Sequence, residues 1–197
     1  MLGVIANGSE AAFMALVERH QAALLRMAEY WLEDEATAEV VVEQTWLAAL
    51  SQLAGFDARS PLRVWLYGML LRHLRSRAFA VEPPGTGATK PAIDPERFAP
   101  PGDRWAGHWK RPPVAWPGRA RPELTVAERS VIDKAIRALP RLQRAVLLLC
   151  DMEGLGSEHA GAIVDLDEAE LGALLHAARS QLRAALDQYY ERRSGAR

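Results

Sequence analysis

The sequence predicts an all-α protein of two small helical domains joined by a Pro- and Trp-rich linker. In both terminal parts of the 197-residue chain, apolar residues recur at helical spacing, as in amphipathic helices. Ten of the twelve prolines fall between Pro83 and Pro122, where a helix could hardly persist. We therefore expect domains at residues 10–80 and 125–190, with the linker at residues 81–124.

The first domain is polarised in charge, although the whole chain carries a net charge of only −1. Between Glu29 and Glu43 lie six acidic residues and no Lys or Arg, whereas residues 59–77 contain five arginines, one histidine and no acid. Such runs also occur on solvated helix faces, so the flanking motifs must decide whether they bind a partner. The basic residues of the second run are Arg59, Arg63, Arg72, His73, Arg75 and Arg77.

The arginine-bearing helix is expected to start at Pro61, with Ser60 as its N-cap. Trp65 follows directly and is interpreted as a core residue that bridges helices. The linker is too aromatic for a plain flexible spacer, because Trp105, Trp109 and Trp116 fall within twelve residues. Part of it is expected to fold onto a surface.

The second domain carries a helix-turn-helix pattern. Its first helix is predicted over Ser157–Val164, with Ser157 as N-cap, and its second over residues 167–186. Asp167 and Glu170 have the spacing of a capping box at the start of the second helix. The apolar face of this helix packs inward, which leaves five residues outward: Glu168, Gly172, His176, Arg179 and Arg183.

These motifs resemble the bacterial RNA polymerase sigma factors of the extracytoplasmic-function (ECF) group. The carboxy-terminal pattern comprises Leu139-Pro140, Arg144, Glu153-Gly154-Leu155 and Leu175-His176-Ala177-Ala178-Arg179. Residues 13–20, 38–47 and 61–68 are similar to successive helices of the sigma domain that holds polymerase and opens the promoter. The resemblance implies a sigma region 2 helical bundle followed by a sigma region 4 helix-turn-helix.

The resemblance also implies partners and roles. RNA polymerase core, through the clamp of its largest subunit, and promoter DNA are the expected partners, with an anti-sigma factor as a further one. The implied polymerase-binding residues are Glu39, Val42, Glu43 and Trp46. The implied DNA-binding residues are Arg59, Arg63, Arg72, His73, Arg75 and Arg77 in the first domain, and Glu168, His176, Arg179 and Arg183 in the second.

The chain departs from the family pattern in both domains. Val40 replaces an acid of the clamp-binding helix. Residues 167–183 hold three acids against two arginines, and Gly172 and Ala173 stand where a side chain that contacts DNA is usual. Because phosphate contacts supply much of the affinity for DNA, we expect weak autonomous binding of the upstream promoter element.

The sequence offers no catalytic or cofactor site. It lacks a Gly-rich phosphate loop, and its five histidines are scattered over different elements, so no metal site is expected. The single cysteine, Cys150, lies in an apolar run and is expected to be a buried thiol in a reducing compartment. No apolar stretch reaches the length of a membrane span. We therefore expect a cytoplasmic protein that is not an enzyme and does not insert into membranes.

Two other interpretations remain open. A stand-alone helix-turn-helix regulator would bind an operator without polymerase, but this gives no reason for the amino-terminal motifs. A sigma-like interaction protein with weakened DNA recognition would instead titrate polymerase or an anti-sigma factor. The departures at Val40 and in residues 167–183 keep this second alternative open.

Overall fold

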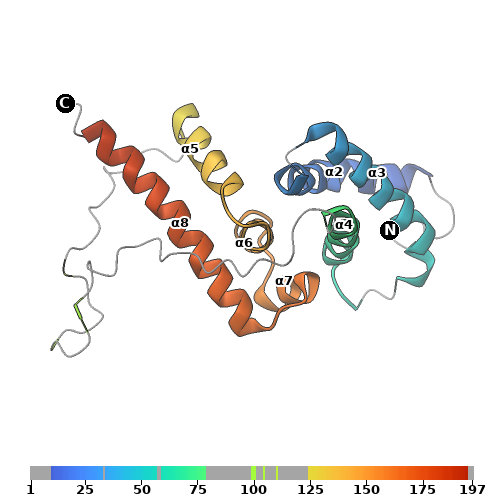
Figure 1. The fold of residues 1–197 in the computed structure, drawn as a ribbon. Coiled ribbons are helices and arrows are strands. Elements are labelled where there is room, and N and C mark those ends of the chain that lie inside the picture. Colours follow the sequence, from blue (N-terminus) through green and yellow to red (C-terminus); the bar gives the residue numbers. More distant parts are fainter. Residues whose placement is uncertain are drawn as a thin grey trace. The chain divides into compact units, whose positions relative to one another are not determined.

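The computed structural model describes residues 10–32, 34–56, 59–78, 99–100, 104, 110 and 124–194. All regular structure in these ranges is helical, which confirms the predicted fold class (Figure 1). In chain order the elements are α2 (Glu10–Leu32), α3 (Glu35–Gln52), the 3₁₀ turn η1 (Leu53–Gly55), α4 (Leu62–Ala78), α5 (Val126–Arg137), α6 (Arg141–Leu147), the π-helical turn η3 (Leu148–Met152), α7 (Ser157–Val164) and α8 (Glu168–Ser194). Most of the predicted linker, including its three tryptophans, lies outside the described residues.

The helix starts follow local capping chemistry, with two corrections to the predictions. The amide of Glu170 donates to Asp167 Oδ1 at 2.8 Å and the amide of Asp167 to Glu170 Oε2 at 3.1 Å, which confirms the capping box. Pro61 lies one residue before α4, and its carbonyl accepts from the Val64 amide at 2.8 Å. Ser157 is the first residue of α7 and not its N-cap, a position held by Gly156.

Thr37 and Asp34 fix the start of α3. The Thr37 amide donates to Asp34 Oδ2 at 2.9 Å, and the Thr37 hydroxyl donates to the same oxygen. These two hydrogen bonds hold the pKa of the Asp34 carboxyl below its usual value, and the one from the Thr37 hydroxyl has the larger effect. Both donors therefore favour the ionised N-cap.

The chain forms two compact units, and one of them combines segments from both ends. The first unit comprises residues 1–86 and 140–174, so α6, η3, α7 and the start of α8 belong with α2, α3 and α4. The second unit comprises residues 87–139 and 175–197. The predicted boundaries at 80 and 125 remain predictions.

Leucines dominate the core of the first unit. Leu24 of α2, Leu70 and Leu74 of α4, and Leu149 of η3 are almost fully buried. Helix α4 packs against α2, α3 and α7, and α6 packs against α2 (Figure 1). Each such leucine contributes about 1.5–3 kcal/mol through the hydrophobic effect.

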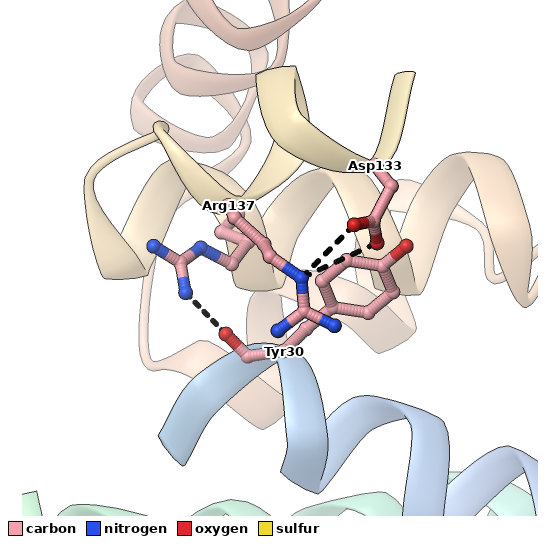
Figure 2. A network of polar contacts seen from close by, with 4 residues as sticks. Tyr30, Asp133 and Arg137 are labelled. Atoms are coloured by element: carbon pink, nitrogen blue, oxygen red, sulfur yellow. Dashed lines mark hydrogen bonds and ion pairs between the residues drawn. The ribbon is translucent and has the colours of Figure 1, made fainter. Parts of the chain in front are cut away.

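The second unit contains α5 and the carboxy-terminal part of α8. The Tyr190 hydroxyl of α8 donates to Glu128 Oε1 of α5 at 2.5 Å. Within α5, Arg137 Nε lies 3.1 Å from Asp133 Oδ2, a pair shown in Figure 2. No described helix is both long and apolar enough to cross a membrane.

The expectation for Cys150 is partly wrong. The residue lies in the π-helical turn η3 and is only half-buried. The turn adds one residue to the apolar run after α6, which rotates Cys150 away from the positions taken by the buried residues Leu148 and Leu149.

Candidate functional site

Helix α4 and the residues before it carry regularly spaced buried leucines and the predicted basic residues. Leu66, Leu70 and Leu74 are buried, so their spacing of four residues defines the inner face. Four of the predicted arginines are exposed, and His73 and Arg75 are half-buried. The exposed arginines are Arg59, Arg63, Arg72 and Arg77, of which Arg59 lies just before the helix.

Among the basic residues, Arg75, Arg63 and Arg77 donate hydrogen bonds within the protein. Arg75 Nη2 donates to the Val164 carbonyl at 2.6 Å, and Arg63 Nη1 donates to the Glu153 carbonyl at 3.2 Å. Arg77 Nη2 donates to Gln44 Oε1 at 3.1 Å. The Arg72 side chain is exposed to solvent.

A cluster around Glu153 was not predicted from the sequence. Arg26 Nη2 lies 2.7 Å from Glu153 Oε1, and the Glu153 side chain is only 15% exposed. Burial raises the pKa of Tyr67 above its usual value, and the hydrogen bond to Glu153 raises it further. The phenol therefore stays protonated and can donate a hydrogen bond to the Glu153 carboxylate. Glu153 was noted only as part of a motif, and nothing in the sequence pairs it with residues more than eighty positions away.

Electrostatics in this cluster also affect His20. Burial, followed by the neighbouring Arg19 and Arg63 cations, lowers its pKa, and the Glu153 carboxylate opposes this shift. His20 therefore favours its neutral form in the folded protein.

A groove of about 260 Å³ between α2 and α3 contains three of the four predicted polymerase-binding residues, Glu39, Glu43 and Trp46. The fourth, Val42, is fully buried, so its side chain cannot take part and that expectation is corrected. The period of the helix places Val42 on the inner face with Ala38 and Ala49. The remaining lining residues are Phe13, Val17, Gln21, Leu47 and Leu50.

Trp46 fixes the floor of this groove. Its indole Nε1 donates to Gln21 Oε1 at 2.5 Å, and its ring meets Phe13 edge to face at 5.9 Å. The sequence analysis missed Leu47, which is 62% exposed and lies one helical turn after Glu43. The signal available in the sequence was the spacing, because a leucine four residues after a predicted contact lies on the same helix face.

The predicted outward face of α8 is largely accessible. Glu168, His176 and Arg179 are exposed, and so is Gly172. Arg183 is half-buried, and its Nε lies 3.7 Å from Asp187 Oδ2 one turn later in the same helix. No cluster of metal-ligating side chains occurs among the residues that the structure describes.

Trp65 lies between core and surface. It is half-buried, and its ring lies 5.0 Å from that of Phe56, which precedes α4. The expectation of a core residue therefore holds for only part of this side chain.

Comparison with known proteins decides the family. Residues 16–79 match Sigma-70 region 2, and residues 129–182 match Sigma-70, region 4. The chain belongs to the sigma-70 family. The two regions occur in the predicted order and contain α4 and the helix-turn-helix, which confirms the predicted resemblance.

Relatives of this sigma factor include members of the ECF group. RNA polymerase sigma factor CnrH of Cupriavidus metallidurans is 27% identical over 192 residues, which cover 92% of this chain and 90% of CnrH. ECF RNA polymerase sigma factor SigG of Mycobacterium tuberculosis is 32% identical over 154 residues, 74% of this chain but only 40% of SigG.

Two solved structures share the fold. CnrH in complex with the cytosolic domain of CnrY has a TM-score of 0.61 at 22% identity, with 95% of each chain covered. The sigma factor RpoE in complex with the anti-sigma factor NepR from Bartonella quintana has a TM-score of 0.58 at 20% identity, with 89% of this chain and 96% of RpoE covered.

Proposed function

We propose that this sigma factor binds RNA polymerase core through the α2–α3 groove and contacts promoter DNA mainly through the arginines of α4. The observation that carries the proposal is the ordered pair of sigma-70 regions, the first of which contains a helix with exposed arginines. The protein is not itself the catalyst: polymerase performs the chemistry, in the cytoplasm.

The α2–α3 groove has the composition of a protein-docking surface. Leu47 and Leu50 are 62% and 51% exposed, and Glu39 and Glu43 line the same groove. Exposed apolar area rimmed by charge marks an interaction site, and acidic residues select a basic partner. The expected occupant is a basic helical surface of the polymerase clamp.

The α4 surface suits the melted downstream promoter element. Arg72 is exposed, and Arg63 and Arg77 are two further exposed arginines of the same helix. Guanidinium groups neutralise phosphates, and single strands bind through backbone charge together with stacking of bases. The Phe56–Trp65 pair lies just before and within the start of α4, where a splayed base could stack.

Helix α8 is proposed to enter the major groove at the upstream element with weaker contacts. Glu168, His176 and Arg179 lie on its exposed face, whereas Arg183 is held by Asp187. A recognition helix with little surplus positive charge gains little from phosphates, so its binding depends on polymerase holding the DNA nearby.

In vitro transcription tests the proposed function. Purified protein and bacterial core polymerase are mixed with a pool of genomic promoter fragments, and the products are sequenced. Transcripts that share an upstream and a downstream motif are expected.

A second candidate function follows from the acidic start of α8, where Glu168 and Glu170 fall in the first turn. In that case the protein titrates polymerase or an anti-sigma factor. Core binding without new transcripts would favour this interaction protein. An operator footprint without polymerase would instead indicate a stand-alone regulator.

A further inference from the structure

A groove of about 600 Å³ lies between α5 and the carboxy-terminal part of α8, inside the second unit (Figure 1). This volume is typical of sites for small ligands, and the space between two helices is a common place for them. None of the residues proposed to contact polymerase or DNA lines this groove. Its side chains therefore need a separate explanation.

The rim of the groove carries positive charge from both helices. Lys134 of α5 and Arg192 and Arg193 of α8 line it, and all three are exposed. Among the described residues that line the groove there is no acid. Asp133 and Asp187, which belong to the same two helices, pair with other arginines of their own helices at 3.1 and 3.7 Å. Cations collected around one groove repel each other, so a bound polyanion is favoured there.

Tyr189 holds one of these cations in place. Arg193 Nη1 donates to the Tyr189 hydroxyl at 2.7 Å, and the guanidinium carbon lies 5.7 Å from the centroid of the Tyr189 ring. The next residue, Tyr190, donates its hydroxyl hydrogen bond to Glu128 and so joins this turn of α8 to α5. A guanidinium has five N–H donors, so Arg193 keeps donors for a ligand. Because it is already held, it loses less conformational entropy on binding.

Small apolar side chains form the wall beneath the cations. Val131 and Ala135 of α5 and Ala185 of α8 line the groove, and all three are half-buried. Val131 and Ala135 are four residues apart and therefore lie on the same helix face. A flat aromatic base can lie against such a wall. The exposed amide of Gln188, also in the lining, offers a donor and an acceptor to the edge of that base.

We propose that the groove between α5 and α8 binds a nucleoside polyphosphate, with its phosphates at Lys134, Arg192 and Arg193 and its base against the apolar wall. Guanidinium and ammonium groups are the usual partners of phosphates. A strand of nucleic acid suits the groove less well, because its phosphates are spread along the chain, one for each nucleotide. The bound nucleotide would bridge α5 and α8 and stabilise the second unit. This inference goes beyond the proposed function, since it requires neither polymerase nor a promoter.

Isothermal titration calorimetry with the full chain tests the class of ligand. The four ribonucleoside triphosphates are titrated separately, and adenosine and inorganic triphosphate serve as controls that lack the phosphates or the base. At least one nucleotide is expected to bind at one site per chain, about tenfold or more tightly than either control. No binding of any nucleotide, or equal affinity for inorganic triphosphate, would overturn the proposal. Displacement of the nucleotide by a lower concentration of a thymine homopolymer would overturn it in favour of a nucleic-acid strand.

Matched variants test the position of the site. Lys134→Gln and Arg192→Gln each remove one cation of the rim, whereas Arg129→Gln removes an exposed arginine of α5 that does not line the groove. Each rim variant is expected to bind the nucleotide about fivefold to tenfold more weakly, as for the loss of a charge-assisted hydrogen bond. Arg129→Gln should keep the affinity of the wild type, and circular dichroism checks that each variant is folded. Equal affinities for all four proteins would place the nucleotide elsewhere and overturn the proposal.

Discussion

Helices α4 and α8 are both expected to meet promoter DNA, yet they are built in opposite ways. Residues 59–77 around α4 contain five arginines and no acid, whereas α8 has Glu168 and Glu170 in its first turn. The acidic side chains in the first turn of α8 interact favourably with the positive end of the helix dipole. The Glu170 carboxylate also accepts a hydrogen bond from the Asp167 amide at the helix start. The sequence of α8 thus stabilises the helix start at the expense of attraction to DNA.

This difference indicates where the DNA-binding free energy comes from. Each phosphate contact releases counterions, so a surface with several arginines binds nucleic acid strongly and with a steep salt dependence. By that criterion we expect α4 to supply most of the free energy of DNA binding and α8 to add orientation. The comparison predicts unequal effects when the two helices are altered.

The largest effect is expected on α4. The double variant Arg72→Ala/Arg75→Ala removes one exposed and one half-buried arginine of α4, so it should abolish promoter opening while core binding is retained. Run-off transcription measures the first, and co-purification with core polymerase measures the second. Undiminished run-off product would contradict the assignment, and Arg19→Ala on α2 serves as the control.

A second effect concerns the turn that presents α8. A Cβ added at Gly161 would lie 2.8 Å from the Leu166 carbonyl oxygen, and backbone at that distance must move. The Leu166 amide also donates to the Gly161 carbonyl at 3.1 Å, and Asp165 between them adopts a left-handed conformation. Gly161→Ala should therefore lower the free energy of unfolding by about 1–3 kcal/mol, as overpacking does.

Gly172 is the matched control for that prediction. It lies on the exposed face of α8, and nothing is within 4 Å of an added Cβ. Gly172→Ala should raise the free energy of unfolding by about 0.5–1 kcal/mol, because alanine favours a helix interior. Urea denaturation measures both variants, and equal shifts in the same direction would contradict the role of the close contact at Gly161.

The sequence predicted local features better than those that join distant segments. The bounds of α7 and the Asp167–Glu170 capping box depend on neighbouring residues, and both agree with the structure. The Glu153 cluster depends on Arg26 and Tyr67, which no periodicity connects to it. The family motif marked Glu153, but only the fold supplies its partners.

Within the candidate site, the motif alone could not predict which side chains are buried. Val42 and Glu43 are neighbours in one motif, yet Val42 is fully buried and Glu43 is exposed. A motif identifies a helix, and the rotation of that helix decides which side chains reach a partner. In α4, the buried residues Leu66, Leu70 and Leu74 recur every four residues, so the sequence did indicate which side chains pack inward there.

A smaller gain is expected from adding charge to α8. Gly172→Arg places a cation on the exposed face without a steric conflict, so it should strengthen binding to the upstream element and steepen its salt dependence by about one phosphate contact. Titration of holoenzyme with promoter DNA at several salt concentrations measures this, and Gly172→Ala controls for helix stability. A salt dependence equal to that of Gly172→Ala would show that this face of α8 does not approach DNA.

The smallest effect concerns His20. This residue lies in α2, and the positive charge of Arg63 in α4 helps to lower its pKa. Burial, Arg19 and Arg63 lower its pKa in the folded protein, so the unfolded chain binds the proton more readily. The free energy of unfolding should therefore fall as the pH drops below about 6.5, the ordinary pKa of histidine. Urea denaturation at pH 7.5 and 5.5 should show a smaller fall for His20→Gln than for the wild type. Arg19→Gln should lie between them, because it removes one of the two cations. If all three proteins lose the same free energy over this interval, another group is responsible, and the positive field of α4 does not extend to α2.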